Sequence, residues 1–402
     1  MRPVMVGKAP AALDMTPETA PIDPGLLPER VAALPGVPAL RDAVAAAGVD
    51  AYLVGGGVRD VLLGADRADL DVAVEGDPLV LADRLEGPTR LHDRFGTATA
   101  AIDGVRVDVA RARREMYPSP GALPDVEPAS LADDLARRDF TVNAMAVPLH
   151  AQAELIDPHH GFDDLRSGLL RVLHNGSFVD DPTRALRAAR YAARLGFELE
   201  PHTEELLRAS DLQTVSEDRI EAELLRLAAE PSARRGFELL GEWGLIALDA
   251  GAGDLIAEII LLLAVDPWRS VAARSLVVYA AATGHGPGPL GRRRDLREAA
   301  RELVDADPAR PSEAVELASG RGDVELVLAR AMSARWLDDY VSSWRHVELE
   351  ISGEDLLARG VPEGPGIGRG LAAALRAKLD GEVSGREAEL ELALTAARNP
   401  GP

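Results

Sequence analysis

The segment AYLVGGGVRDVLLGADRADLDVAV (residues 51–74) decides the fold of the first part of the chain. Its apolar start predicts a strand, the three glycines predict a turn, and the residues after them predict the beginning of a helix. The alternation in DLDVAV (69–74) predicts a second strand, and VRVDVA (105–110) repeats that pattern. From residue 50 to about residue 149 we therefore expect short strands that alternate with loops and helices.

The chain from about residue 181 onward has a different pattern. Apolar residues recur there at helical spacing, for example in 182–197, 219–230 and 253–265. Glycine-rich segments at 284–291 and 363–368 predict turns between helices. The predicted fold class is therefore α+β, with a small mixed sheet in the first part and an all-helical remainder.

The composition is that of a globular protein with an acidic balance. The chain has 402 residues, 47% of them hydrophobic and 27% charged, a length that suggests about two to three domains. Its 44 basic and 66 acidic residues give a formal net charge of −22, so a nucleic-acid partner would need a local basic surface. Cysteine is absent, which excludes disulfides, thiolate zinc sites and cysteine nucleophiles.

Neither a targeting segment nor a membrane span is predicted. The longest apolar run, residues 255–265, contains Glu258 and is too short to cross a bilayer. Asp14 and Glu18 interrupt the first 25 residues, so no signal-peptide core forms there. We therefore expect a cytoplasmic protein with a flexible tail over residues 1–26.

Asp69 and Asp71 form a pair of carboxylates in the second predicted strand. Residues i and i+2 of a strand face the same side, about 7 Å apart. Two like charges at that distance favour a divalent cation with hard oxygen ligands, and Asp108 would complete the cluster if its strand lies alongside. Such a group suits two-metal phosphoryl transfer, in which one ion activates the attacking hydroxyl and the other holds the leaving pyrophosphate. Taken alone, the pattern also fits a solvated edge strand.

The glycine turn at residues 55–57 is a candidate anion site. Glycines after a strand let backbone N–H groups approach a phosphate, and the following helix directs its positive end there. Arg59 would add a guanidinium to the same phosphates. A dinucleotide-binding GxGxxG motif would need glycine at Asp60, and a P-loop would need a Gly-Lys-Ser/Thr that is absent. A plain tight turn would also explain the glycines.

Together these motifs resemble the head-domain signature of class II tRNA nucleotidyltransferases and bacterial poly(A) polymerases. The resemblance is dense from about residue 52 to residue 245 and weaker beyond. The matching segments are GG-x-VRD (55–60), LLG (62–64), DLD (69–71), FGT (95–97), ARRE (112–115), PGALP (120–124), RRDFT-x-NA (137–144) and DDPTRALRAAR (180–190). One departure is Asp180, which stands where the family usually has glutamate and should alter the support of its neighbours more than the chemistry.

The resemblance implies an organisation and a set of site residues. It implies a flexible tail at 1–26, a polymerase beta-like nucleotidyltransferase head at 27–160, a helical neck with a base-reading helix at 161–235, a helical body at 236–345 and an RNA-binding tail at 346–402. It implies that Asp69 and Asp71 bind Mg²⁺. These two acids, with Asp108 from the other predicted strand, are the candidate catalytic residues. The implied nucleotide-binding residues are Gly55, Gly56, Arg59, Arg138, Asp139 (near the ribose), Asn143, Asp181, Arg184, Arg187 and Arg190.

Asp181 and Arg184 lie three residues apart at the start of a predicted helix and therefore share a face. Asp181 is a candidate N-cap, and Arg187, Arg190 and Arg194 continue the face. A solvated, arginine-rich surface helix would show the same spacing. A carboxylate only accepts hydrogen bonds and a guanidinium only donates them. The pair therefore complements the Watson–Crick edges of cytosine and adenine and leaves groups unpaired against uracil and guanine.

The predicted function is template-independent addition of C, C and A from CTP and ATP to the 3′ end of tRNA. An A-adding enzyme or a poly(A) polymerase of the same family is the first alternative. A CC-only enzyme is disfavoured because the flexible loop of the family that the chain resembles is complete here, from Arg113 to about Pro128. An inactive RNA-binding protein is the second alternative, and the intact pair of Asp69 and Asp71 argues against it. Candidate RNA contacts are the arginines at 234–235 and 292–294, which a solvated surface would also explain.

Overall fold

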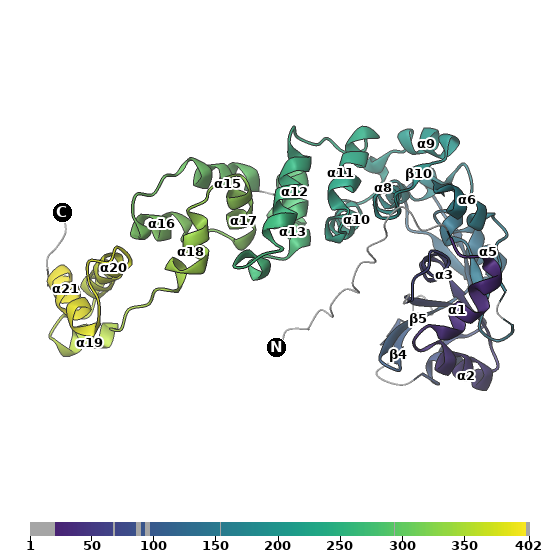
Figure 1. Ribbon diagram of the computed structural model, residues 1–402, viewed down its shortest axis with the longest axis horizontal. Helices are drawn as coiled ribbons and strands as arrows, with labels where there is room; N and C mark the ends of the chain where they lie inside the picture. Colours follow the sequence, from purple (N-terminus) through teal and green to yellow (C-terminus); the bar gives the residue numbers. More distant parts are fainter. Residues whose placement is uncertain are drawn as a thin grey trace. The chain divides into compact units, whose positions relative to one another are not determined.

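The structure, a computed structural model, describes residues 21–66, 69–85, 90–92, 97–152, 154–292 and 294–398. The chain divides into two compact units, Met1–Ala247 and Leu248–Pro402, and each is considered by itself (Figure 1). Most of the predicted flexible tail, the pair Phe95-Gly96 and Arg293 lie outside the described residues. The finer division into head, neck, body and tail stays a prediction.

A mixed sheet of six strands forms the centre of the first unit, in the order β3-β4-β5-β2-β1-β8. Its strands are β1 (Asp50–Val54), β2 (Leu70–Glu75), β3 (Arg90–His92), β4 (Thr97–Ile102), β5 (Val105–Arg111) and β8 (Ala146–Pro148). β2 and β5 are parallel and the other neighbours are antiparallel. In this register Asp71 pairs directly with Asp108. The two predicted acidic strands are therefore neighbours.

Short helices lie beside this sheet (Figure 1), and one two-stranded hairpin follows its fifth strand along the chain. The elements are α1 (Leu27–Ala33), α2 (Val37–Ala47), α3 (Gly56–Leu62), α4 (Pro78–Ala82), β6 (Arg113–Met116), β7 (Asp125–Pro128), α5 (Leu131–Ala136), the 3₁₀ turn η3 (Thr141–Asn143) and α6 (Gly161–Ser167). Two positions at the start of α3 require glycine. Gly55 has a φ of +72°, which side-chain-bearing residues rarely adopt. A Cβ on Gly57 would lie only 2.5 Å from the Asp69 carbonyl oxygen. The turn thus brings α3 against the start of β2.

The remainder of the first unit is helical apart from the two-stranded pair β9 (Leu169–Leu170) and β10 (Glu198–Leu199). Its helices are α7 (Ser177–Asp180), α8 (Thr183–Leu195), α9 (Pro201–Arg208), α10 (Glu217–Ala229) and α11 (Ala233–Glu242). α8 packs on α10 and α11 through small buried residues such as Ala185, Ala188 and Ala189. Arg187 and Arg190 of α8 lie beside this contact and face Glu223 of α10.

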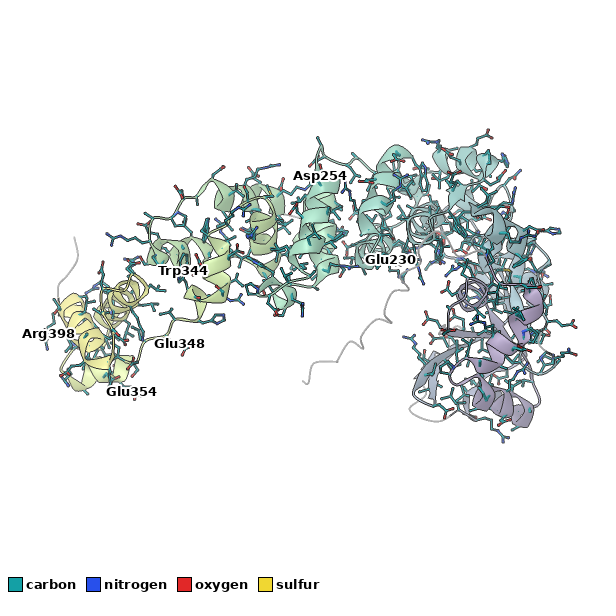
Figure 2. All side chains as sticks on the ribbon, in the orientation of Figure 1. Glu230, Asp254, Trp344, Glu348, Glu354 and Arg398 are labelled. Atoms are coloured by element: carbon teal, nitrogen blue, oxygen red, sulfur yellow. The ribbon has the colours of Figure 1, made fainter. Side chains whose placement is uncertain are left out.

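The described residues of the second unit form helices and no strand. The helices are α12 (Ala252–Leu262), α13 (Arg274–Thr283), α14 (Gly288–Gly291), α15 (Leu296–Asp305), α16 (Pro311–Ala318), α17 (Asp323–Ala331), α18 (Leu337–Ser342), α19 (Gly353–Ala358), α20 (Pro365–Leu379) and α21 (Arg386–Arg398). Non-helical residues 347–352, which include Glu348, precede α19 (Figure 2). The last three helices enclose a small core of their own around Leu356, Ala374 and Ala393. The predicted α+β class is confirmed.

Within the described part of the chain, no helix combines the length and apolar character needed to cross a membrane. The cytoplasmic location stays a prediction.

Candidate active site

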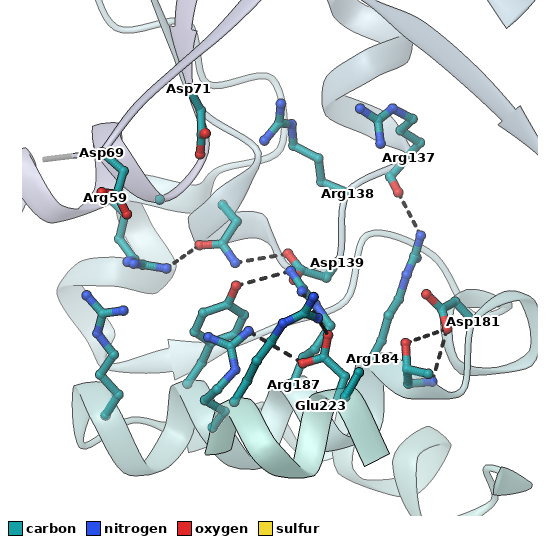
Figure 3. Close-up of a pocket in the computed structure, with 18 of the residues that line it drawn as sticks. Arg59, Asp69, Asp71, Arg137, Arg138, Asp139, Asp181, Arg184, Arg187 and Glu223 are labelled. Atoms are coloured by element: carbon teal, nitrogen blue, oxygen red, sulfur yellow. Dashed lines mark hydrogen bonds and ion pairs between the residues drawn. The ribbon is translucent and has the colours of Figure 1, made fainter. Parts of the chain in front are cut away.

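A cavity of about 600 Å³ in the first unit brings the predicted site residues together. Figure 3 shows Asp69 and Asp71 on one side of it, Asp181 and Arg184 on the other, and Asp139 with Arg187 between them. All the predicted site residues line this cavity except Gly55 and Asp108. The acidic pair and the predicted base-reading pair, more than 100 residues apart in the sequence, therefore face one space.

The acidic side of the cavity brings together carboxylates whose negative charge Arg138 offsets only in part. Asp71 lies in β2 and Asp69 directly precedes it. Burial, followed by the neighbouring Asp108 and Asp69, raises the pKa of Asp71 to about 6, while Arg138 opposes the rise. Among the described residues, no group of three or more histidine, aspartate or glutamate side chains is already arranged as a metal site. The two acids thus fit a dication as a partial ligand set.

Asp108 faces a second, smaller cavity of about 320 Å³ that Asp71 and Arg138 also line. Thr99 donates its hydroxyl to Asp108 Oδ1 at 2.6 Å. Arg106 forms an ion pair with Asp108 Oδ2 at 2.9 Å. Asp108 therefore acts on Asp71 through its charge, and its own oxygens are engaged by protein donors.

Arg59 is a buried residue of α3 that donates hydrogen bonds to Asp60 and Asn143. Its Nε and Nη2 donate to Asp60 Oδ1 at 2.8 and 2.7 Å, and its Nη1 donates to Asn143 Oδ1 at 2.5 Å. Gly55 lies against the Arg138 guanidinium, since a Cβ there would be 2.6 Å from Nη1 of that arginine. The glycine turn thus seats Arg138 beside the cavity.

Asp139 is the centre of a saturated hydrogen-bond network. Its Oδ1 accepts from the Phe140 backbone N–H and from Asn143 Nδ2, both at 2.9 Å. Its Oδ2 accepts from Arg187 Nε at 2.9 Å and Nη2 at 2.5 Å. Burial alone would raise the pKa of Asp139, but the Arg187 guanidinium and the Asn143 hydrogen bond outweigh it and hold the pKa well below its usual range. Four donors fill the roughly four acceptor sites of a carboxylate.

Three arginine side chains lie around the ring of Tyr191, a residue of α8. Guanidinium carbons of Arg59, Arg187 and Arg190 lie 5.3, 5.6 and 4.6 Å from the Tyr191 ring centroid. This geometry is typical of cation–π contacts.

Glu223 of α10 lies 3.6 Å from Arg187 and 3.7 Å from Arg190 and is bonded to Arg226. Sequence reasoning missed this residue. The available signal was an acid on the apolar stripe that includes Leu224 and Leu227, because an acid in such a place needs partners.

The predicted base-reading pair is held from several sides. Arg184 is 5% exposed, and it donates to the Ser177 hydroxyl and the Arg137 carbonyl oxygen, both at 2.7 Å. Asp181 Oδ1 accepts from the Thr183 N–H at 3.0 Å. α8 begins at Thr183, one residue later than an N-cap at Asp181 would place it, but the carboxylate still caps the first N–H. Arg219 of α10, which also binds Asp181, was not foreseen.

Comparison with known proteins gives consistent matches. A family model described as the poly A polymerase head domain matches residues 51–171, and one described as a probable RNA and SrmB-binding site of polymerase A matches residues 196–248. The A-adding tRNA nucleotidyltransferase of Geobacter sulfurreducens is 34% identical over 86% of this chain and 45% of its own length. The CC-adding tRNA nucleotidyltransferase of Deinococcus radiodurans is 36% identical over 87% of this chain and 91% of its own. The chain spans about half or less of the A-adding relatives it matches.

Solved structures match nearly the whole chain. A CCA-adding enzyme in an apo form superposes with a TM-score of 0.75 at 28% identity, covering 93% of this chain and 96% of that one. The Thermotoga maritima CCA-adding enzyme complexed with tRNA gives a TM-score of 0.68 at 27% identity, with the same coverage. The fold, the motifs and a relative matched over almost its full length together show that this chain belongs to the tRNA nucleotidyltransferase and bacterial poly(A) polymerase family.

Proposed function

We propose that this protein is a tRNA nucleotidyltransferase that adds C, C and A, from CTP and ATP, to the 3′ end of tRNA. The observation that carries the proposal is the single cavity lined by both the acidic pair Asp69/Asp71 and the pair Asp181/Arg184. Similarity to CCA-adding enzymes over 93% of the chain supports the same activity.

Magnesium is the proposed cofactor, in line with the general dependence of this family on divalent metals. Asp69 and Asp71 would hold it, because the raised pKa of Asp71 indicates negative charge that a dication would offset. Bound Mg²⁺ supplies activation of the attacking hydroxyl and stabilisation of the transferring phosphate. Substrate phosphates would complete a ligand set that the protein fills only in part.

The arginines of the cavity are proposed to bind the triphosphate. Arg187, Arg190 and Arg194 lie on one face of α8, and Arg138 reaches the same space from the other side. Guanidinium groups suit this task because their planar forks match phosphate oxygens. Arg59 is already bound to Asp60 and Asn143, so its proposed contribution is a fixed positive charge beneath the glycine turn.

Asp139 is proposed to act mainly through Arg187 and Asn143. Its acceptor sites are filled by protein donors, so the ribose contact that the resemblance implies would require one of these bonds to be exchanged. Asp139 would therefore orient Arg187 toward the nucleotide and keep that guanidinium in place between turnovers.

Selection of cytosine and adenine is proposed for Asp181 and Arg184. Arg184 uses three of its five N–H groups on Ser177, Arg137 and Tyr117, which leaves donors for a base. The hydrogen bonds that Thr183 and Arg219 donate to Asp181 end on Oδ1, so Oδ2 is the proposed acceptor for a base. Together they offer a donor and an acceptor at the far side of the cavity from Asp69.

A narrower repertoire is the second candidate. Relatives 34%, 43% and 49% identical over their matched segments carry the name A-adding tRNA nucleotidyltransferase, which favours addition of the terminal A alone. A poly(A) polymerase is the third candidate and an inactive RNA-binding protein is the fourth.

One incorporation assay separates these functions. The purified chain is incubated with Mg²⁺, labelled CTP or ATP, and one of three primers: tRNA lacking the whole CCA end, tRNA lacking only the last A, or oligo(A). Addition of both nucleotides to the shortest tRNA, ending at A, is the expected result. Addition of a single A only to the second primer selects the A-adding enzyme, and unlimited A addition selects the polymerase. Absence of incorporation with retained tRNA binding selects the inactive binder and refutes the proposal.

A further inference from the structure

One guanidinium joins the predicted base-reading carboxylate to the loop between β6 and β7. Arg219 Nη2 donates to Asp181 Oδ1 at 2.9 Å, and Arg219 Nη1 donates to the Gly121 carbonyl oxygen at 2.7 Å. The side chains of Arg219 and Asp181 are 26% and 19% exposed, so neither is freely solvated. Residues 117–124 are thus tied to Asp181 through one residue of α10.

Both backbone polar groups of Gly121, its N–H and its carbonyl oxygen, form hydrogen bonds that attach the loop. The Gly121 N–H donates to the Val179 carbonyl oxygen at 3.1 Å, two residues before Asp181. Gly121 has a φ of +70°, and a Cβ there would lie 2.5 Å from the Thr214 carbonyl oxygen. No larger residue fits without moving the loop. The attachment therefore depends on the shape of this turn rather than on a loop side chain.

The same guanidinium limits how the Asp181 carboxylate can turn. Oδ1 accepts from Thr183 N–H at 3.0 Å, from Thr183 Oγ1 at 2.6 Å and from Arg219 at 2.9 Å. Two of these donors belong to Thr183, the residue that begins α8. Arg219 supplies the third, and it is the one charged donor of the three. Three donors converging on one oxygen leave Oδ2 as the acceptor for a nucleobase.

We infer that Arg219 is a positioning residue for nucleotide selection. It fixes the carboxylate of Asp181 and makes that orientation depend on the seating of loop 117–124 at Gly121. This inference rests on the proposed function, in which Asp181 accepts from the exocyclic amino group of the incoming base. Without Arg219 the carboxylate rotates, its match to cytosine weakens, and its rejection of uracil weakens with it.

The test compares kcat and KM for CTP and UTP on tRNA that lacks its CCA end. Arg219→Gln is expected to lower the CTP-to-UTP ratio of kcat/KM by about tenfold, mainly through a higher KM for CTP. Arg219→Lys should restore part of the ratio, because its ammonium reaches one partner and not both. Arg208→Gln is the matched control: it removes an exposed α9 arginine paired with Glu204, outside the cavity, and should leave the ratio unchanged.

Gly121→Ala provides a second variant that leaves the guanidinium in place. It displaces the loop backbone and should lower the same ratio, and the double variant with Arg219→Gln should add little to either single one. It also carries the test if Arg219→Gln fails to give a cooperative thermal transition.

A purely structural role would reduce kcat/KM for both nucleotides equally, so a ratio within about twofold of wild type in either folded variant overturns the inference while the proposed function stands. Wild-type protein that incorporates neither nucleotide would overturn both.

Discussion

Replacing Asp71 by asparagine is expected to make the metal-free protein more stable while it abolishes nucleotide transfer. Asparagine keeps the shape of the carboxyl group and removes a charge that burial and its acidic neighbours disfavour. The same change removes a proposed magnesium ligand. Binding of tRNA should be nearly unaffected, because positioning of the RNA does not require the reacting phosphate to be activated.

The magnitude follows from the pKa of Asp71. It rises from 3.8 to about 6, which at 1.36 kcal/mol per pKa unit is about 3 kcal/mol. The side chain is only partly buried, so we expect a gain of about 1–2 kcal/mol in the free energy of unfolding. Between about pH 4 and pH 6 the folded state binds the proton more tightly than the unfolded state, so wild-type stability falls as the pH rises through this window. The advantage of the variant should therefore be absent below it and complete above it.

Urea unfolding with a chelator, at several pH values, measures this difference. Asp42→Asn, an exposed position on α2, is the matched control and should change nothing. Added Mg²⁺ should stabilise the wild type and not the Asp71 variant, because only the wild type has both ligands. Equal stability of variant and wild type above about pH 6, or substantial transfer by the variant, would refute the reasoning.

Three further changes test other parts of the site. Arg184→Ala should erode discrimination between CTP and UTP in the incorporation assay, and unchanged selectivity would remove the base-reading role. Asp139→Asn should cost about 3 kcal/mol in urea unfolding near neutral pH, because Arg187 loses its buried partner. The low pKa of Asp139 means that wild-type stability from this pair is lost as the pH falls below about 4, so the cost should shrink there. Gly57→Ala should lower transfer by at least about tenfold, since a Cβ there meets the Asp69 carbonyl oxygen; Gly322→Ala, where nothing lies within 4 Å, is the control, and equal activity of the two would contradict the close packing.

Local sequence patterns predicted the central strands and their acids well. The apolar run before the glycine turn is β1, the Asp-Leu-Asp segment leads into β2, and residues 105–110 lie in β5. Each of these depends on side-chain alternation and turn residues, which act over a few positions. The parallel pairing of β2 with β5 could not be read from alternation, because register is set by packing across the whole sheet.

Residues that act from a distant helix were not predictable in this way. Arg219 and Glu223 lie in a segment that reads only as an amphipathic helix, and their partners at 121, 181, 187 and 190 become neighbours through the packing of α10 on α8. Local spacing places Glu223 on the apolar stripe of α10 but does not identify its partners, and it gives no sign that Arg219 turns toward Asp181. Such roles belong to the tertiary structure.

The predicted turn at 363–368 is confirmed in its first two residues, which bend between α19 and α20, and is wrong for the rest. α20 begins at Pro365, inside the glycine-rich segment. A Cβ on Gly366 would lie 3.0 Å from the Ala397 carbonyl oxygen, and one on Gly370 would lie 2.5 Å from that of Ala393. The glycines therefore allow two helices, α20 and α21, to touch along their backbones, a requirement that single-sequence turn rules assign to loops.

Glu223 gives the arginine-rich side of the cavity an internal counterion. Arg187, Arg190 and Arg226 all contact this one carboxylate, so their mutual repulsion is reduced when nothing occupies the cavity. Under the proposed function, an incoming triphosphate would compete with Glu223 for the same guanidinium groups. In the proposed reaction, that competition would weaken binding of the departing diphosphate, and product release after each addition would be easier than from a cluster of unopposed cations.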